Sequence, residues 1–393
     1  MSEKRGSDLV GVGGVFDVVV VGGGVIGLSC AWRLVQRGAR VAVVERGEPG
    51  GGATRVAAGM LAPVGELTFG EPELLELTLA AARLYPEFVA ELEAASGEAT
   101  GYEELGALHV ALDRDEAEQL RRVHDLQRSL ELEAEWLPPR RCRDLEPGLT
   151  PSFHGGVLAP GEAAVDPRAL TLALSAAVRS EGGEVMTGTE VVAGVFEGER
   201  LVGVQTARRR SDTQEVSDRR LDAEIRAEAV ILATGAWSGA TEWLPEPARP
   251  SVRPVKGQVV ELRRRDGEPP ARHILASERV YLVPRADGRL VVGATVEEMG
   301  YDTAVTAGAV HELLREAYRL LPDVAEMELI DAIVGLRPGT PNNLPLVGPG
   351  AIDGLVLATG HFRNGILLAP LAARAVADLL SAAPSSQPEK VVR

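Results

Sequence analysis

The sequence predicts an α/β domain combined with an α+β domain that is built on an antiparallel sheet. Three observations indicate this fold: a strand, glycine turn and helix near the N-terminus, a group of short strands with Asp-Gly turns, and a strand ending in Ala-Thr-Gly. At roughly 100–200 residues per domain, 393 residues correspond to two domains, with three as the outer case.

The first predicted strand, Phe16–Val21, is short and rich in β-branched residues, which is typical of a strand buried on both faces. It leads into a G-x-G-x-x-G pattern, and a predicted helix runs from Val25 to Arg37 and stops at Gly38. Gly22 allows a tight turn, and Gly24 lets a pyrophosphate approach the backbone closely. Gly27 lets the helix pack closely on the strand.

A second predicted strand, Arg40–Val44, ends at Glu45. A carboxylate at this point can accept hydrogen bonds from an adenosine ribose, while the N-terminus of the first helix offers N–H groups to a diphosphate. The two features predict a Rossmann-like dinucleotide site. The acid favours NAD or FAD over NADP, because a carboxylate repels a 2′-phosphate.

The segment Gly50–Met60 favours FAD over NAD, because it is a long stretch of small residues where a nicotinamide enzyme would continue with another βα unit. Small residues let backbone lie against a ribityl chain and an isoalloxazine ring. The segment Ala229–Trp237 is a strand ending in Ala-Thr-Gly, a pattern that recurs in FAD proteins where the chain returns to the dinucleotide domain.

Composition excludes several classes of protein. Hydrophobic residues make up 45% and charged residues 25%, which is ordinary globular usage. The formal net charge of −16 disfavours a nucleic-acid binder and a polybasic membrane-surface protein. The two cysteines, Cys30 and Cys142, and the scattered histidines lack metal-ligand spacing, so we expect a reduced cytoplasmic setting without disulfide or metal.

One segment imitates a membrane span. Leu9–Trp32 has Asp17 as its only charge and is long enough to cross a bilayer. It contains seven glycines and is better explained by the strand, turn and helix described above. We therefore expect neither a transmembrane helix nor a signal peptide.

Near the C-terminus, the segment Gly335–Pro349 contains Arg337 between an apolar stretch and a proline turn. This placement predicts an arginine at a strand end facing a cleft. A fixed guanidinium can bind a carboxylate through two parallel hydrogen bonds, although a structural salt bridge is the alternative.

After a predicted strand over Gly354–Ala358, a helix is predicted to run to about Leu380, with Asn364 as its N-cap. Its N-terminus could direct N–H groups and positive dipole toward an anion that develops on a flavin.

Strands joined by turns are predicted over Val252–Leu262, Arg279–Pro284 and Arg289–Thr295. The segment 72–130 is predicted to be mostly helical, 208–220 to be a charged hairpin loop, and 381–393 to be a frayed tail.

Together these residues resemble the D-amino-acid oxidase superfamily of FAD-dependent amine oxidases, and within it the glycine oxidases of bacterial thiamine synthesis. Seven segments carry the resemblance, which covers nearly the whole chain: Gly22–Gly27 with Glu45, Ala57–Leu61, Pro254–Gly257, Tyr281–Arg285, Gly288–Thr295, Gly335–Thr340 and His361–Pro370.

The resemblance implies a discontinuous FAD-binding domain (1–85, 140–245 and 328–380), a substrate domain with an antiparallel sheet (86–139 and 246–327) and a tail (381–393). It implies non-covalent FAD, since neither cysteine is at the position that binds flavin covalently in sarcosine oxidases. Implied FAD contacts, beyond the glycines above, are Val25, Ile26, Glu45, Arg46, Ala53, Thr54, Ala58, Gly59, Met60, Val191, His361, Phe362, Arg363, Asn364, Gly365, Ile366 and Leu367.

The resemblance also places Arg337 at the carboxylate-binding position, and Tyr281 and Arg363 in the substrate pocket. Val296 stands where a close relative has methionine, and Ala276 and Arg279 also differ, which leaves glycine, sarcosine and small D-amino acids open as substrates.

The implied reaction is oxidative deamination by hydride transfer to flavin N5, which yields imine or glyoxylate, ammonia and hydrogen peroxide. Dioxygen is the implied oxidant, thiazole synthase a possible partner, and a homotetramer the implied assembly. Three alternatives remain: a dehydrogenase that passes electrons to a quinone, a non-catalytic FAD-binding subunit, and an NAD-dependent dehydrogenase. For Lys256, assistance to oxygen and a structural role are both open.

Overall fold

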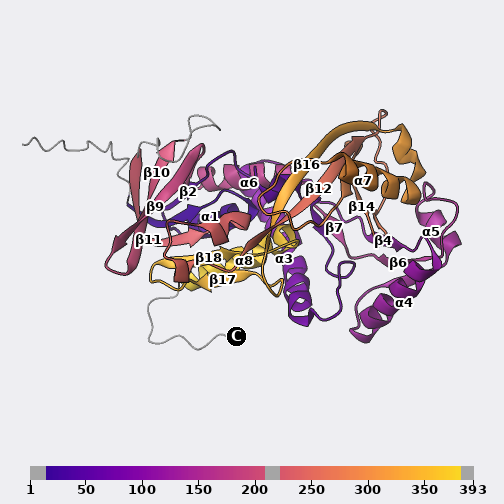
Figure 1. The fold of residues 1–393 in the computed structure, drawn as a ribbon, viewed down its shortest axis with the longest axis horizontal. Helices are drawn as coiled ribbons and strands as arrows, with labels where there is room; N and C mark the ends of the chain where they lie inside the picture. The colour runs from indigo at the N-terminus through magenta and orange to yellow at the C-terminus, as the bar shows by residue number, and fades with distance from the viewer. Residues whose placement is uncertain (1–14, 209–221, 382–393) are drawn as a thin grey trace, which may run out of the picture.

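A computed structural model describes residues 15–208 and 222–381. The predicted charged loop and tail therefore lie, apart from Arg208 and Ser381, outside the described residues. The chain builds two large sheets that occupy opposite halves of the molecule (Figure 1). This arrangement confirms the predicted combination of an α/β part with a part built mainly on antiparallel strands.

The first sheet is parallel at its centre and has the order β17-β18-β11-β1-β2-β8, with β10 and β9 continuing antiparallel from β11. The strand bounds are β1 Val15–Val21, β2 Val41–Val44, β8 Glu184–Met186, β9 Thr189–Glu197, β10 Arg200–Arg208, β11 Ala223–Leu232, β17 Leu346–Pro349 and β18 Leu355–Thr359.

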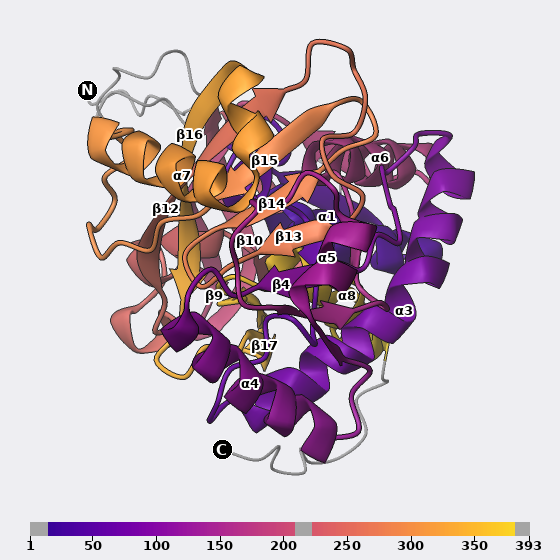
Figure 2. The same cartoon turned by 90° about the vertical axis from the view of Figure 1, so that its right-hand side faces the viewer.

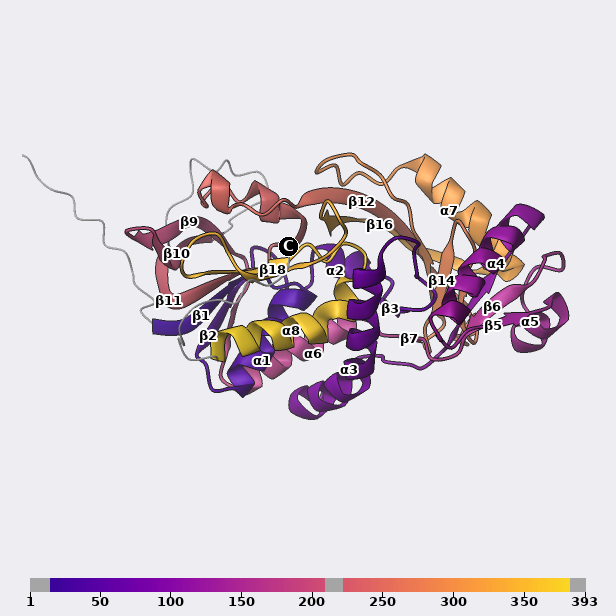
Figure 3. The same ribbon diagram turned by 90° about the horizontal axis from the view of Figure 1, so that it is seen from below.

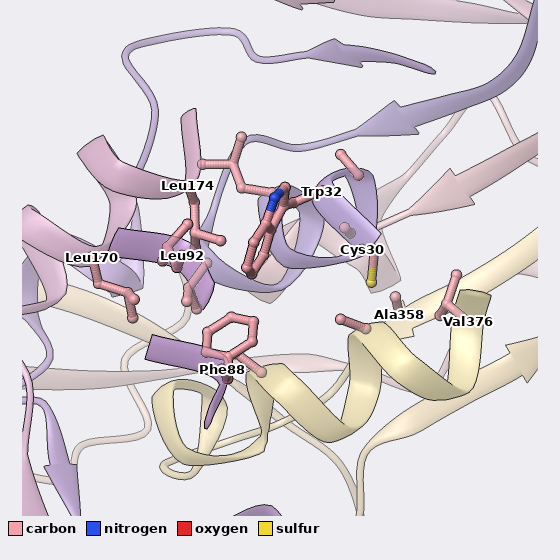
Figure 4. Close-up of a cluster of buried hydrophobic side chains, with 14 of the residues drawn as sticks. Cys30, Trp32, Phe88, Leu92, Leu170, Leu174, Ala358 and Val376 are labelled. Atoms are coloured by element: carbon pink, nitrogen blue, oxygen red, sulfur yellow. The ribbon is translucent and has the colours of Figure 1, made fainter. Parts of the chain in front are cut away.

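Four helices form a layer with the first sheet, and α1, α6 and α8 lie side by side beneath it in Figure 3. Their bounds are α1 Val25–Gln36, α3 Pro72–Ser96, α6 Pro167–Ser180 and α8 Gly365–Ser381. The core of this layer centres on Trp32, which is completely buried and meets the ring of Phe88 edge to face at 5.3 Å between centroids (Figure 4). Burial of aromatic and aliphatic side chains in this core holds α1 against the first sheet.

The second sheet has the order β16-β12-β15-β14-β13-β4-β6-β5 and is antiparallel except between β13 and β4. The strand bounds are β4 Ala107–Val110, β5 Glu135–Leu137, β6 Gly156–Ala159, β12 Arg253–Arg263, β13 Ile274–Ala276, β14 Tyr281–Pro284, β15 Arg289–Gly293 and β16 Glu328–Gly339.

Helices α4 (Arg114–Ser129), α5 (Pro139–Leu145) and α7 (Ala307–Leu320) lie on the outer side of the second sheet, toward the viewer in Figure 2. Apolar residues of α7 pack with those of the sheet in one core. The opposite face of this sheet turns toward the first half of the molecule. The remaining elements are short: α2 Ala53–Val56, β3 Met60–Leu61, β7 Ala163–Ala164, η2 Gly235–Ala240, η3 Glu246–Ala248 and η4 Pro322–Glu326.

Two segments differ in sheet membership from the domain boundaries that we expected. Both β6 and β16 belong to the second sheet, although residues 140–245 and 328–380 were assigned to the FAD-binding domain. Strand β16 joins the second sheet because it is long and pairs with β12 along nearly its whole course. Both strands run between the two halves of the molecule (Figure 3). The segment 72–130, predicted to be mostly helical, also contains strand β4.

Over the described ranges 15–208 and 222–381, none of the helices is both long enough and apolar enough to cross a bilayer.

Candidate cofactor and substrate cavity

A cavity of about 1200 Å³ lies between the two sheets, and we call it the interdomain cavity. Its lining comes from the carboxyl end of β1, the start of α1, residues 44–68, the turn before α8, and the inward face of the second sheet. Residues far apart in the sequence therefore meet around one space.

The glycine turn occupies one end of the interdomain cavity and is sterically specified. Gly22 has a φ of +111°, and a Cβ there would lie 2.4 Å from the carbonyl oxygen of Ala233. A Cβ on Gly27 would lie 2.0 Å from the carbonyl oxygen of Gly22, so only glycine permits this contact of helix and turn. Gly24 precedes α1 and lines the cavity, where it leaves room for an anion at the helix N-terminus.

Glu45 follows β2 and lines the same end of the cavity. Its Oε2 accepts the Gly23 N–H at 2.7 Å and its Oε1 accepts the Gly47 N–H at 2.8 Å. The carboxylate therefore holds the glycine turn in place, and it lines the cavity where a ribose is expected.

The small-residue segment forms the wall next to the glycine turn. Thr54 of α2 accepts the Val25 N–H at 3.2 Å, which ties this segment to α1. Gly59 has a φ of +76°, and a Cβ there would lie 1.9 Å from the Val165 carbonyl oxygen. The buried guanidinium of Arg285 donates to the Ala58 carbonyl oxygen and so fixes the same backbone.

The turn before α8 closes the cavity from the C-terminal part of the chain. Phe362 has a φ of +47° and donates its N–H to the Pro338 carbonyl oxygen at 3.0 Å. Asn364 stands directly before α8, as expected of an N-cap, and its carbonyl accepts the Leu368 N–H. His361 is buried, and burial lowers the pKa of its imidazole to about 3, so the ring is neutral.

Arg337 lies on β16 above Gly257 of the neighbouring strand β12. A Cβ on Gly257 would lie 2.2 Å from Nη1 of Arg337, so this glycine gives the guanidinium its space. Nη1 also donates to the Thr295 carbonyl oxygen at 3.0 Å, which fixes the group where it lines the cavity.

Tyr281 on β14 also lies over a glycine of the neighbouring strand. Its ring covers Gly293, where a Cβ would lie 2.4 Å from the hydroxyl oxygen. Burial raises the pKa of the Tyr281 hydroxyl to about 12, an effect that the Arg337 charge partly opposes, so the group stays a hydrogen-bond donor. Arg363 donates to Thr68 Oγ1 at 2.7 Å and lines the cavity as well.

The residues around the cavity fit FAD. One end has a glycine turn that admits no Cβ, a helix N-terminus and a fixed carboxylate, and the wall that follows consists of small residues. Nε2 of His361 is buried without a hydrogen-bond partner among the described residues, which marks a place for a polar ligand atom.

Most of the predicted site residues line the interdomain cavity. The exceptions are Gly27, which packs on the glycine turn, Asn364, which borders a separate small cavity, and Leu367, which belongs to the core around Trp32. The residues found in the lining are Gly22, Gly24, Val25, Ile26, Glu45, Arg46, Ala53, Thr54, Ala58, Gly59, Met60, Val191, Tyr281, Arg337, His361, Phe362, Arg363, Gly365 and Ile366.

Several polar residues of the lining were not predicted from the sequence, and they include Glu66, His109, Gln119 and Glu162. These four lie in segments without a motif, and His109 is one of several scattered histidines without metal-ligand spacing. Only the pairing of β4 with β13 and β6 brings His109 to the site. Cys30 and Cys142 are buried and do not line the cavity.

Lys256 is fully buried, but its amino group turns away from the interdomain cavity. Nζ forms an ion pair with Asp302 and donates to the Ala304 carbonyl oxygen at 2.7 Å. These contacts favour the structural role over assistance to oxygen, because they attach the segment 298–306 to β12.

Replacing Gly257 by alanine is expected to impair substrate binding while FAD remains bound. The new methyl group would overlap the far end of the Arg337 side chain, which can move, so the guanidinium shifts and the backbone does not. Because the displaced guanidinium no longer meets the substrate carboxylate, we expect KM to rise at least tenfold. A tenfold change in affinity corresponds to about 1.4 kcal/mol of binding free energy. Steady-state kinetics and the ratio of FAD to protein check this; an unchanged KM would contradict the placement of Arg337.

Replacing Lys256 by methionine is expected to lower the free energy of unfolding by about 1–3 kcal/mol, because the Ala304 carbonyl loses its donor. The cost stays moderate because Asp302 is 40% exposed and can be solvated. Thermal denaturation measures the loss. Stopped-flow reoxidation by dioxygen should be unchanged, and a large fall in its rate would restore the oxygen-assisting role.

A cavity between a sheet with a parallel centre and a mainly antiparallel sheet, lined by a dinucleotide turn and by Arg337 and Arg363, is the arrangement expected of a flavin-dependent oxidoreductase. The model of the DAO family, described as FAD dependent oxidoreductase, matches residues 17–379. The chain belongs to this family, and its cofactor is FAD.

Similar proteins include a bifunctional protein ThiO/ThiG from Trichormus variabilis, 37% identical over 93% of this chain and 52% of its own length. The chain thus spans about half of such relatives. A glycine oxidase from Geobacillus kaustophilus is 35% identical over 93% of both chains. The crystal structure of glycine oxidase from the same species superposes with a TM-score of 0.82 at 34% identity, covering 93% of this chain and 94% of that one.

Proposed function

We propose that the protein is an FAD-dependent oxidase of glycine and related small amines. One observation carries the proposal. The guanidinium of Arg337 is held over Gly257 and lines the same cavity as the glycine turn that fits the dinucleotide. Relatives that match over nearly their whole length and are named glycine oxidase support the same substrate class.

In this proposal Arg337 receives the carboxylate of the amino acid, and the Tyr281 hydroxyl donates a further hydrogen bond. Arg363, which pairs with Glu71 at 3.6 Å, lines the same cavity. When bound, FAD supplies the redox chemistry, taking a hydride from the substrate α-carbon and passing the electrons to dioxygen. Positioning of the α-carbon by the fixed guanidinium is the main contribution of the chain.

The lining limits the size of the substrate. Ala276, Tyr281 and Val296 line the same cavity as Arg337, and the Tyr281 ring covers Gly293. We infer that glycine and sarcosine are preferred and that small D-amino acids such as D-alanine are accepted less well. Imine or glyoxylate, ammonia and hydrogen peroxide are the expected products.

We also infer a cytoplasmic homo-oligomer, a tetramer, that hands its imine to a thiazole synthase. The relatives named ThiO/ThiG support the last inference, since both names are joined there in one chain.

Anaerobic titration of the purified protein tests the substrate class. Glycine, sarcosine, D-alanine and D-proline are each added while the flavin absorbance is followed, and air is then admitted with a peroxide assay. We expect bleaching by glycine or sarcosine, and one peroxide formed per substrate oxidised. Bleaching without peroxide would indicate a dehydrogenase that uses another acceptor, and a flavin that no amino acid bleaches would indicate a non-catalytic subunit.

A further inference from the structure

Arg285 is a buried cation behind the wall of the interdomain cavity. It follows β14 and is only 5% exposed. Its guanidinium donates to the Ala58 carbonyl oxygen, and this is its one side-chain hydrogen bond among the described residues. Nε is buried without a partner there. Because a guanidinium carries five N–H donors, a single acceptor leaves this group poorly satisfied for a buried charge.

Two acids border the same small cavity as Arg285, and both are paired with other arginines. Arg289 donates to Asp166 at 2.6 Å and to Glu261 at 3.1 Å. Arg168 also donates to Glu261, at 2.9 Å. No ion pair within the part of the chain that the structure describes includes Arg285 itself. Its charge is therefore not neutralised by a direct contact.

The guanidinium of Arg285 is charged although it is buried. Burial lowers its pKa, an effect that the charge of Arg289 increases and that the charges of Asp166, Glu103 and Glu261 oppose. The ordinary pKa of arginine is so high that the group stays protonated at neutral pH. A buried cation without an ion pair destabilises a fold, so we expect its charge to serve a function.

The Ala58 peptide lies along the path that a cofactor takes from its diphosphate. Thr54 accepts the Val25 N–H at the start of α1, where the diphosphate is expected. The Val56 side chain lies over β16, since a Cβ on Gly335 would be 2.9 Å from it. The segment that contains Ala58 therefore leads from the diphosphate end of the cavity toward the second sheet. The part of FAD that follows the diphosphate includes the flavin ring, and we expect it beside this segment.

Arg285 and the interdomain cavity lie on opposite sides of this peptide. Ala58 lines the interdomain cavity, whereas Arg285 does not and borders a small separate cavity together with Ala57. The positive charge is shielded from solvent, and its field reaches the interdomain cavity across one peptide group. Reduction adds two electrons and one proton to a flavin, so the cofactor gains one negative charge that such a field favours.

We propose that the buried charge of Arg285, held behind the Ala58 peptide, favours the reduced form of FAD and so sets its reduction potential. Arg285 is then a positioning residue, because it acts through the peptide that lines the cavity. In turnover a hydride supplies both electrons and the proton. This role concerns the cofactor, so it holds whichever amino acid the enzyme oxidises.

Two variants change the buried charge in opposite directions. Arg285→Met removes the positive charge and keeps a long apolar stem. Asp166→Asn removes a negative charge that acts on Arg285, and it keeps the N-cap of α6 because asparagine caps helices as well as aspartate does. Arg285→Lys keeps the charge. Arg263→Met is the matched control, since Arg263 is an exposed arginine at the end of β12 in the same sheet.

The test measures the two-electron reduction potential of the FAD-loaded proteins by equilibration with reference dyes, which needs no substrate. At an effective dielectric constant of about 20, two unit charges about 12 Å apart change an equilibrium constant roughly tenfold. We therefore expect Arg285→Met to lower the equilibrium constant for reduction about tenfold, a shift of about 30 mV to more negative potential. Asp166→Asn should shift the potential in the positive direction. Arg285→Lys should stay closer to wild type than Arg285→Met, and Arg263→Met should not differ from wild type.

An unchanged potential in Arg285→Met would overturn the inference. Shifts of the same sign in Arg285→Met and Asp166→Asn would also overturn it, because the sign must follow the charge that is removed. If Arg285→Met does not fold or does not retain FAD, the Asp166→Asn shift decides, and a zero or negative shift overturns the inference. A wild-type flavin that dyes reduce but no small amino acid reduces would instead overturn the proposed function.

Discussion

Gly27→Ala should destabilise the protein and weaken its hold on FAD, although alanine is normally the better helix former. Gly27 lies in the first turn of α1, where the change would by propensity stabilise the helix by up to about 1 kcal/mol. Its Cβ would, however, lie 2.0 Å from the Gly22 carbonyl oxygen, a backbone atom that cannot move aside without displacing the turn. Overpacking of this kind costs about 1–3 kcal/mol or more, so the steric term exceeds the propensity gain.

The measurements for Gly27→Ala are thermal denaturation without cofactor and titration with FAD. Separation of α1 from the turn moves the anion-binding N–H groups, so the Kd for FAD should rise at least about tenfold, equivalent to 1.4 kcal/mol. Gly308→Ala is the matched control, since Gly308 lies in helix α7 with open space around its Cβ position. Equal behaviour of the two variants would contradict the steric account of the glycine turn.

Removal of the Arg337 guanidinium should abolish efficient turnover of amino acids. In Arg337→Ala the substrate carboxylate enters the cavity without its charged partner, and such truncations cost about 2–5 kcal/mol. This corresponds to a fall in kcat/KM of roughly 30- to 4000-fold, mainly through KM, because the contact exists in ground state and transition state alike.

Arg337→Lys keeps the charge but cannot form two parallel hydrogen bonds, so its kcat/KM should fall between wild type and Arg337→Ala. Arg374→Ala is the control on the exposed side of α8 and should leave the kinetics unchanged. FAD content should stay normal in all three variants. Normal KM and kcat in Arg337→Ala would remove Arg337 from the substrate site.

The dinucleotide end of the site could be predicted from sequence because its constraints are local. Gly22, Gly24, Gly27 and Glu45 lie within 24 residues, and the structure gives Gly22 and Gly27 the contacts that their spacing implied. Arg337 could be singled out because a strand and a proline turn flank it, but its support by Gly257 depends on the register of β12 with β16. The ends of β14 and β15 differed from prediction by only two residues each.

The part of the lining that contains His109 and Glu162 could not be predicted, because it forms only through long-range packing. His109 is placed by the parallel pairing of β4 with β13, in which it stands opposite Ala276, 167 residues later in the chain. Glu162 comes from a short connection between β6 and β7 with no motif around it. The membership of β6 and β16 in the second sheet likewise depends on long-range pairing, since composition does not report which sheet a strand joins.

The proposed function requires that FAD lies in the interdomain cavity and that Arg337 steers an amino acid to it. The most direct measurement is anaerobic stopped-flow reduction of the FAD-loaded protein by glycine and by glycine deuterated at its α-carbon. The account predicts saturable bleaching that is slower with the deuterated substrate, because the α-carbon hydrogen leaves as hydride. A protein that stays colourless after FAD is supplied, or a bound flavin that glycine does not reduce, would contradict it.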